Sequence, residues 1–334
     1  MARMRVGLLG ASGETGGSIL NGLLEDGGFD IVAFSRPSSI NRPANLALKD
    51  KGVELREMDL AKDSQDQLVA ALKRIDVLLS AIGAPAQLDQ IPLVTAAKTA
   101  GVKRFVPCGY IPVIPAGGVH LLRDQKEEVY NHMKRLGLPY TIIDCGWWYQ
   151  VSTPRLPSGK IDNVIMMEPP IANKGEQPSA LTDLRDVGRY VARVIKDDRT
   201  LNKQVLVYNE MWSQSQVWDK LEEVSGEKLT RNYVSQEQLE GKLADAKKVL
   251  ESDPSSFMNL LHMIETQYLI SWGCRGDNTP EYAKYLGYIT SEELYPDFKY
   301  VKFEEYVNDL VAGKIDEFYV EMKEQLKAML PMKP

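Results

Sequence analysis

The chain has 334 residues, with 40 basic and 46 acidic side chains and a net charge of -6. This acidic balance gives no electrostatic basis for binding nucleic acid or an anionic membrane surface, and no apolar stretch approaches the roughly 18 residues of a membrane span. Three cysteines and three histidines, all scattered, suit neither a disulfide framework nor a metal centre, so we expect no metal and a cytoplasmic location.

The first predicted element is a strand that runs into a glycine turn. Residues 6–17, VGLLGASGETGG, join a short apolar run to glycines spaced three apart. Such a pattern occurs in ordinary turns between strand and helix, but it is also typical of a turn that binds pyrophosphate, because glycine lets the backbone approach a phosphate at a helix N-terminus. The cofactor contacts expected here are Gly10, Ser12, Gly13, Glu14, Thr15 and Gly16.

A second apolar run follows about one helix later and favours the nucleotide interpretation. Residues 31–34 read IVAF and lead into Ser35 and Arg36, where a site selective for NAD would carry an acidic residue. Arg36, together with Ser35 and Ser38, suits a 2′-phosphate instead. The expected cofactor is therefore NADP(H).

Strands and helices continue to alternate through the first 150 residues. Further strands are expected at residues 52–59, 76–83, 104–107 and 140–144, with helices near residues 68–72, 94–101 and 123–136. This order predicts an α/β fold with a doubly wound parallel sheet of the Rossmann type, whose cofactor lies across the carboxyl ends of the strands. Cofactor candidates at these ends are Ile82, Gly83, Cys108, Gly146 and Trp147.

The second half of the chain is less regular. We expect a dinucleotide-binding domain over residues 1–150 and a smaller α+β substrate-binding region over residues 151–334, partly interleaved with the first. Its expected helices cover residues 181–195, 213–225, 235–250, 257–270 and 304–329, the last interrupted at Gly313, and a strand is expected at residues 204–208.

Several motifs together resemble one known family. Residues 10–16, Ser35 with Arg36, and residues 103–107, 126–140 and 224–228 are similar to the NmrA-like and isoflavone reductase-like family, an atypical branch of the short-chain dehydrogenases. The amino-acid sequence of residues 117–119 and 122–124 resembles that of family members from fungal secondary metabolism. The resemblance implies NADP(H) binding and a lysine at position 126 that contacts cofactor and substrate on the helix flanking the nicotinamide.

The chain departs from this family near the expected lysine. Residues 108–111 read CGYI where plant reductases carry SEFG, which implies a different substrate, and Leu122 replaces the tyrosine of the Tyr-x-x-x-Lys pair. Lys126 would then act with Tyr110 or Tyr149 as proton donor or pocket wall. The alternative is a solvated helix lysine beside Glu127 and Glu128.

Other side chains are expected to complete the site. The catalytic candidates are Lys126, Tyr110, Asp124 and Tyr149, and the substrate-binding candidates are Tyr110, Arg123, Trp148, Tyr149 and Glu168. Trp147 and Trp148 could line a substrate pocket, or they could simply pack beneath the substrate-binding region that follows them. Cys108 could be a nucleophile, although a small buried apolar residue is the more common role of such a cysteine.

Three functions are compatible with these features. The favoured one is an NADPH-dependent reductase that delivers hydride to a C=C, C=N or C=O bond of a small aromatic or alkaloid-like metabolite. The second is a non-redox acid/base enzyme that keeps NADP for structure and closes an iminium ring, as in a Pictet–Spengler reaction. The third is an NADP-sensing regulator. The expected partner is a small molecule, and the expected assembly is a monomer or homodimer.

Overall fold

The structure of the chain is a computed structural model that describes residues 3–163, 170–320 and 322–324. The chain divides into two compact units. The first comprises Met1–Cys145, Leu184–Val207 and Pro280–Phe298, and the second comprises Gly146–Asp183, Tyr208–Thr279 and Lys299–Pro334. The expected substrate-binding region, residues 151–334, thus contributes segments to both units.

The first unit is built on a parallel sheet, which confirms the expected fold class. Five strands lie in the order β3-β2-β1-β4-β5, and Val6 of β1 is in register with Ile31 of β2 and Val77 of β4. Every residue of β4 is buried, as expected for a strand covered on both faces. The bounds are β1 Met4–Leu9, β2 Phe29–Ser35, β3 Glu54–Glu57, β4 Val77–Ser80 and β5 Arg104–Val106.

Three more parallel strands extend this unit. They pair in the order β13-β10-β6, and a single parallel bridge from Phe105 to Tyr140 connects β6 with the first sheet. The first six strands therefore follow the Rossmann order 3-2-1-4-5-6. The bounds are β6 Thr141–Asp144, β10 Lys203–Leu206 and β13 Ile289–Thr290, so two strands from late in the sequence complete the nucleotide-binding unit.

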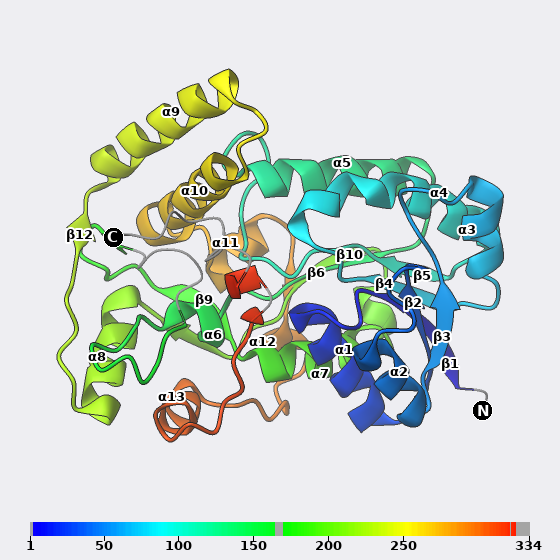
Figure 1. The fold of residues 1–334 in the computed structure, drawn as a ribbon, viewed down its shortest axis with the longest axis horizontal. Helices are drawn as coiled ribbons and strands as arrows, with labels where there is room; N and C mark the ends of the chain where they lie inside the picture. Colours follow the sequence, from blue (N-terminus) through cyan, green and yellow to red (C-terminus); the bar gives the residue numbers. More distant parts are fainter. Residues whose placement is uncertain (1–2, 164–169, 321, 325–334) are drawn as a thin grey trace. The chain divides into compact units, whose positions relative to one another are not determined.

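Helices cover both faces of the sheet, as Figure 1 shows: α3, α4 and α5 lie on one side, and α1 and α7 on the other. Beneath α3 to α5 lies an apolar core that includes Leu72, Leu93, Phe105 and Val129. The helices of this unit are α1 Glu14–Asp26, α2 Pro43–Asp50, α3 Gln65–Ala71, a 3-10 helix Ala84–Asp89, α4 Gln90–Ala100, α5 Leu121–Arg135, α7 Leu184–Val194, a 3-10 helix Asp198–Thr200, α11 Pro280–Tyr285 and α12 Ser291–Leu294.

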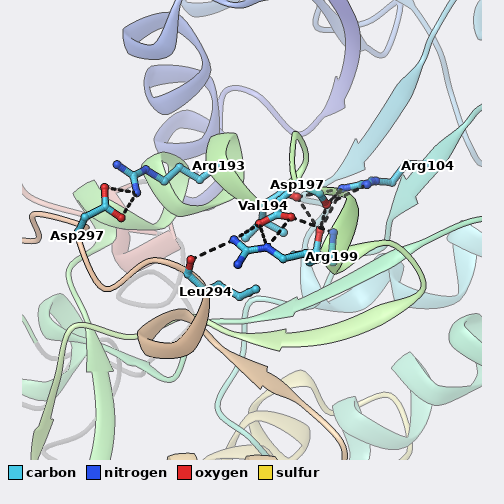
Figure 2. A network of polar contacts seen from close by, with 8 residues as sticks. Arg104, Arg193, Val194, Asp197, Arg199, Leu294 and Asp297 are labelled. Atoms are coloured by element: carbon cyan, nitrogen blue, oxygen red, sulfur yellow. Dashed lines mark hydrogen bonds and ion pairs between the residues drawn. The ribbon is translucent and has the colours of Figure 1, made fainter.

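A polar network holds two segments from the second half of the chain, residues 184–207 and 280–298, in the first unit (Figure 2). At the start of β5, Arg104 donates to the Val194 carbonyl at 2.9 Å and to Thr200 Oγ1 at 3.2 Å. This satisfies a carbonyl at the end of α7 that has no partner within the helix. Arg199 donates to the Leu294 carbonyl at 3.1 Å, so the network also reaches α12. A surface hollow of about 540 Å³ lies here, lined by Arg193, Lys196, Asp197, Asp198, Arg199 and Tyr295.

The second unit has small sheets and a helical layer. Its strands are β7 Trp147–Trp148, β8 Ile171–Ala172, β9 Ser179–Thr182, β11 Glu210–Trp212 and β12 Tyr233–Val234, paired as β11-β9-β7 and β12-β8. Its helices are α6 Tyr149–Ser152, α8 Gln214–Ser225, α9 Gln236–Ser252, α10 Phe257–Tyr268, a π-helical turn Leu269–Arg275, and α13 Phe303–Val311. The expected helix at residues 304–329, interrupted at Gly313, corresponds to α13, which ends at Val311 before that glycine, and to helical residues 320 and 322–324 after it. None of the described helices is long and apolar enough to cross a membrane.

Helices α1 and α7 touch through two glycines. A Cβ on Gly22 would lie 2.2 Å from the Gly188 carbonyl carbon, and a Cβ on Gly188 would lie 1.8 Å from the Ser18 carbonyl oxygen. Side chains at these positions cannot fit without separating the helices, because backbone atoms on both sides block the space.

We expect Gly188→Val to lower the free energy of unfolding by more than about 3 kcal/mol, since overpacking a backbone contact forces whole helices apart. Urea unfolding followed by circular dichroism measures this loss. Gly17→Ala is the matched control, because its Cβ would lie 3.8 Å from its nearest neighbour, the Ala11 carbonyl oxygen. Equal urea midpoints for Gly188→Val and wild type would show that α1 and α7 separate at little cost.

Candidate active site

Two glycines of the first turn are required by the packing of the protein itself. Gly10 has a φ of +81°, and a Cβ there would lie 2.3 Å from the Ala81 carbonyl oxygen. A Cβ on Gly16 would lie 1.9 Å from the Gly10 carbonyl oxygen. These glycines therefore allow the tight turn and the close approach of α1 to β1.

Gly13 differs from both of its neighbours in the motif. Its φ is -89°, which any residue adopts, and a Cβ there would have only the Gly10 carbonyl oxygen nearby, at 3.5 Å. The residue is exposed, as is Ser12, and no side chain caps the N-terminus of α1. The structure itself gives no reason for glycine at this position. A phosphate resting on the backbone and on the first N–H groups of α1 gives one.

The end of β2 presents a cationic group. Arg36 is exposed, and within the described part of the chain no hydrogen bond or ion pair engages its guanidinium. Asn45 shapes the loop behind it by donating to Ser35 Oγ at 3.1 Å and to the Ser39 carbonyl at 2.7 Å. Ser38, expected beside them, is exposed. The region is therefore open to an anion such as a 2′-phosphate.

Neither helix α2 nor its residue Asn45 was predicted from the sequence. The signal was present in Pro43, which occupies the first turn of α2 after the N-cap residue Arg42. Arg42 is exposed, so this helix start adds a second arginine to the same loop.

Lys126 is buried, not solvated. The whole residue is only 3% exposed. Its Nζ atom donates to the Cys108 carbonyl at 2.7 Å and to Gln87 Oε1 at 3.0 Å. Helix α5 supplies the lysine, the end of β5 supplies the carbonyl, and the 3-10 helix after β4 supplies Gln87. The alternative of a surface lysine beside Glu127 and Glu128 is therefore wrong.

The ammonium group keeps capacity for a ligand. It has three N–H donors: two reach oxygens, and the third donates to the weak acceptor Cys108 Sγ at 3.8 Å, which a ligand oxygen could replace. The thiol donates to the Ile82 carbonyl at 3.3 Å, so Cys108 packs as a buried side chain within the site. Gln87, which also donates to the Gly83 carbonyl at 3.3 Å, was not indicated by any motif.

A buried ionic cluster lies beside Lys126 on α5. Asp144 Oδ2 accepts hydrogen bonds from Tyr288 at 2.6 Å and from Arg123 Nη1 at 3.0 Å, and Arg123 Nη2 donates to Glu127 at 2.6 Å. Burial raises the pKa of the Asp144 carboxyl against the opposing effects of Arg123, Tyr288 and Lys126. Arg123, expected to bind substrate, is thus engaged by internal carboxylates, because it is the counter-charge of a fully buried Asp144.

Asp124 has a local partner as well. Its two carboxylate oxygens accept the backbone N–H groups of Gly117 and Gly118 at 2.8 and 2.9 Å. Asp124 therefore holds the loop that leads into α5. Both oxygens of a carboxylate that was expected to transfer protons are thus engaged in backbone hydrogen bonds.

Tyr110 follows the sharp turn at the end of β5. Its φ is +57°, and a Cβ on the preceding Gly109 would lie 2.4 Å from the Ile143 carbonyl oxygen. The hydroxyl is buried without a hydrogen-bond partner among the described residues, and burial raises its pKa well above the usual value, with Cys108 and Cys145 adding to the effect. A left-handed residue with an unpaired buried hydroxyl is typical of functional sites.

Of the expected residues, Gly146, Trp147, Trp148 and Tyr149 belong to the second unit, whereas Glu14, Thr15, Ile82 and Gly83 belong to the first. Gly146 has a φ of +64°, and a Cβ there would lie 2.3 Å from the Ala180 carbonyl oxygen. The ring of Trp148 stacks on Tyr319 at 6.1 Å. Tyr149 is fully buried and donates to Glu210 at 3.2 Å, which gives it a partner within the core of this unit. Glu168 lies outside the described residues.

No metal centre is found within the described ranges, where no group of three or more His, Cys, Asp or Glu side chains could hold an ion. Of the histidines, His120 caps α5 by accepting the Leu122 N–H at 3.1 Å, which is a structural role.

Known proteins resemble this chain over nearly its full length. The sequence model of the NmrA-like family matches residues 3–307. The asnovolin J 5′,6′-dehydrogenase of Aspergillus novofumigatus is 46% identical over 315 residues, which cover 93% of this chain and 96% of that protein. The probable pinoresinol-lariciresinol reductase 3 of Arabidopsis thaliana is 27% identical, with 92% of this chain and 98% of that protein covered.

Solved structures show the same fold. One from a study of pinoresinol-lariciresinol and phenylcoumaran benzylic ether reductases has a TM-score of 0.76 at 26% identity, with 93% of this chain and all of that chain covered. The leucoanthocyanidin reductase of Vitis vinifera in complex with NADPH has a TM-score of 0.76 at 21% identity, with 92% of this chain and 99% of that chain covered.

We expect Gly13→Val to abolish NADPH binding while the protein stays folded, because the added side chain occupies ligand space and meets no backbone atom closely. Titration of NADPH by fluorescence measures the affinity, and Gly17→Ala serves again as control. Wild-type affinity in Gly13→Val would remove the pyrophosphate assignment.

Arg36→Ala is expected to weaken NADPH binding by about 10- to 150-fold and to leave NADH binding nearly unchanged, because a charge-assisted hydrogen bond contributes roughly 1.5–3 kcal/mol. Calorimetric titration with both nucleotides separates the two effects. Equal losses for NADPH and NADH would show that Arg36 does not read the 2′-phosphate.

Proposed function

The chain belongs to the NmrA-like family, and we propose that it is an NADP(H)-dependent oxidoreductase acting on a small secondary metabolite. The single observation that carries this proposal is Lys126, a buried lysine at the carboxyl edge of a Rossmann sheet, whose Nζ donates to two oxygens and, for its third N–H, only to the weak acceptor Cys108 Sγ at 3.8 Å. A lysine buried at this position suits catalysis better than a structural role alone, because its charge has no carboxylate in direct contact within the described part of the chain.

The chain has residues that suit the cofactor. The open cradle at Gly13 and the N-terminus of α1 would hold the pyrophosphate, and Arg36 would hold the 2′-phosphate. When bound, the nicotinamide supplies or takes up a hydride. The relatives include a protein named as a dehydrogenase and others named as reductases, which supports redox chemistry in either direction.

Lys126 has two tasks in this proposal. The Cys108 carbonyl and Gln87 orient Nζ. The third N–H would exchange the weak acceptor Cys108 Sγ for a ribose hydroxyl or for a substrate oxygen that gains negative charge. The same group moves a proton to or from that oxygen. Tyr110 is the second candidate for proton transfer, since its buried hydroxyl has no hydrogen-bond partner among the described residues. Within the same residues, no hydrogen bond joins Tyr110 to Lys126.

The favoured reaction is reduction of a polarised C=C, C=N or C=O bond in an aromatic or alkaloid-like substrate. The non-redox cyclisation receives less support, because it needs free proton-transfer groups while Asp124 and Tyr149 are engaged by Gly117, Gly118 and Glu210. A regulator that only senses NADP could also hold the ribose with Lys126, so the relatives named as a dehydrogenase and a reductase are what favour an enzyme over a regulator. The cytoplasmic location and the monomeric or dimeric state stay predictions from the sequence.

We expect Lys126→Met to lower turnover by about 10²- to 10⁴-fold, the usual contribution of a positioned acid/base group, with a smaller change in NADPH affinity. Steady-state kinetics and NADPH titration measure the two effects. Lys134→Met is the matched control, because Lys134 lies on the same helix and is exposed. Comparable losses in both variants would remove Lys126 from the site.

Deuterium on the transferable position of NADPH distinguishes the candidate reactions. A reductase places the label in the product, as mass spectrometry would show. Product formed from protein loaded with NADP⁺, without label transfer, would overturn the reductase and support the cyclisation.

A further inference from the structure

Cys108 and Lys126 bring a thiol and an ammonium group into contact within the first unit. Nζ of Lys126 lies 3.8 Å from Sγ of Cys108 and donates its third N–H to the sulfur. Among the described residues, no carboxylate contacts Lys126 and draws its ammonium group away from the thiol. The structure thus holds a nitrogen and a sulfur, two oxidisable atoms, side by side.

The contact is held from several sides. Nζ also donates to the Cys108 carbonyl at 2.7 Å, so the lysine is bound to the backbone of the residue that carries the thiol. The amide of Gln87 contacts both groups, because its Oε1 accepts from Nζ at 3.0 Å and its Nε2 donates to Sγ at 3.6 Å. Two groups fixed in this way react as if each were present at high concentration beside the other.

The thiol hydrogen points away from the lysine. Sγ donates to the Ile82 carbonyl at 3.3 Å and accepts from Lys126 and Gln87. The lone pairs of the sulfur therefore face the nitrogen, which is the side on which a new bond would form.

Burial limits which reagents reach this pair. Cys108 is 7% exposed and Lys126 is 3% exposed, so a bulky thiol such as glutathione would have to open the site first. Dioxygen is small and uncharged and does not meet this obstacle. Cys274, by contrast, is only partly buried, so it is the cysteine on which bulky reagents are expected to act.

We propose that Cys108 and Lys126 are the site of a reversible oxidative cross-link, in which one oxygen atom of dioxygen joins Sγ to Nζ. This inference rests on the proposed function, because the cross-link withdraws the lysine that the enzyme uses and so regulates that same site. A direct S–N bond fits less well, since it would have to close more of the 3.8 Å separation than a bridge that contains an oxygen atom.

The cross-link consumes one molecule of dioxygen. The S–H bond, two N–H bonds and the O–O bond break, while one S–O bond and one O–N bond form. The second oxygen atom leaves as water, and one proton is released. Sulfur and nitrogen each lose two electrons, and dioxygen gains all four. Two molecules of dithiothreitol return these electrons, which restores the thiol and the ammonium group and releases the bridging oxygen as water.

Intact-mass spectrometry detects the cross-link without any assay of activity. Protein prepared with dithiothreitol is freed of the reductant and divided, with one part kept under argon and the other in air-saturated buffer. We expect only the aerated part to gain about 14 Da, which is one oxygen atom less two hydrogen atoms, and to lose this mass when dithiothreitol is added back.

A trypsin digest and three variants identify the joined residues. Modified Lys126 resists trypsin, so the peptide of residues 105–123 should be found linked to the peptide of residues 124–134. Neither Cys108→Ser nor Lys126→Arg should gain this mass in air. Cys274→Ser is the matched control, and it should form the cross-link as wild type does.

The contrary outcomes are distinct. An unchanged mass in air overturns the cross-link. A gain of about 16 or about 32 Da on Cys108 without linked peptides shows ordinary thiol oxidation and also overturns it, as does a loss of about 2 Da from a disulfide. A gain of about 14 Da that persists in Lys126→Arg removes Lys126 from the proposal.

Activity separates this inference from the proposed function. Hydride transfer from NADPH should fall in step with the cross-linked fraction and recover with dithiothreitol. A reversible cross-link in a protein that transfers no hydride would contradict the proposed function and leave the modification site in place. Hydride transfer that continues at the full rate in cross-linked protein would overturn the regulatory role.

Discussion

The buried ion pair between Asp144 and Arg123 is the interaction on which the first unit depends. It joins the end of β6 to α5, and Tyr288 brings in the segment before β13. Removing one partner of such a pair costs about 3–5 kcal/mol, because the other charge stays buried and unpaired. A helix fixed in this way keeps Lys126, one turn further along α5, within reach of the Cys108 carbonyl.

Much of this unit is predictable from the sequence, because its signals are local. The glycine turn, the apolar run before Arg36 and the buried strand β4 each give their structure within a few residues. The resemblance to the NmrA-like family adds the role expected of Lys126, which spacing alone does not indicate. The burial of that lysine agrees with the expectation.

The parts that were not predictable depend on partners far apart in the sequence. Arg123 on α5 and Tyr149 on α6 each suit a substrate site until the internal partner is known, and these partners lie 21 and 61 residues away. Gln87 lies in no motif, and it joins the site only because the 3-10 helix after β4 brings it to Lys126.

The two late strands of the first unit also determine when this unit can fold during synthesis. β10 pairs directly with β6, and β13 pairs with β10, so the sheet is complete only after residue 290 has left the ribosome. The outer edge of β6 carries unpaired backbone groups until β10 is made, and the outer edge of β10 does so until β13 is made. Such edges expose the growing chain to association with other strands. Pairing over such long loops is slow. The nucleotide-binding unit therefore matures late, although its first strand is made first.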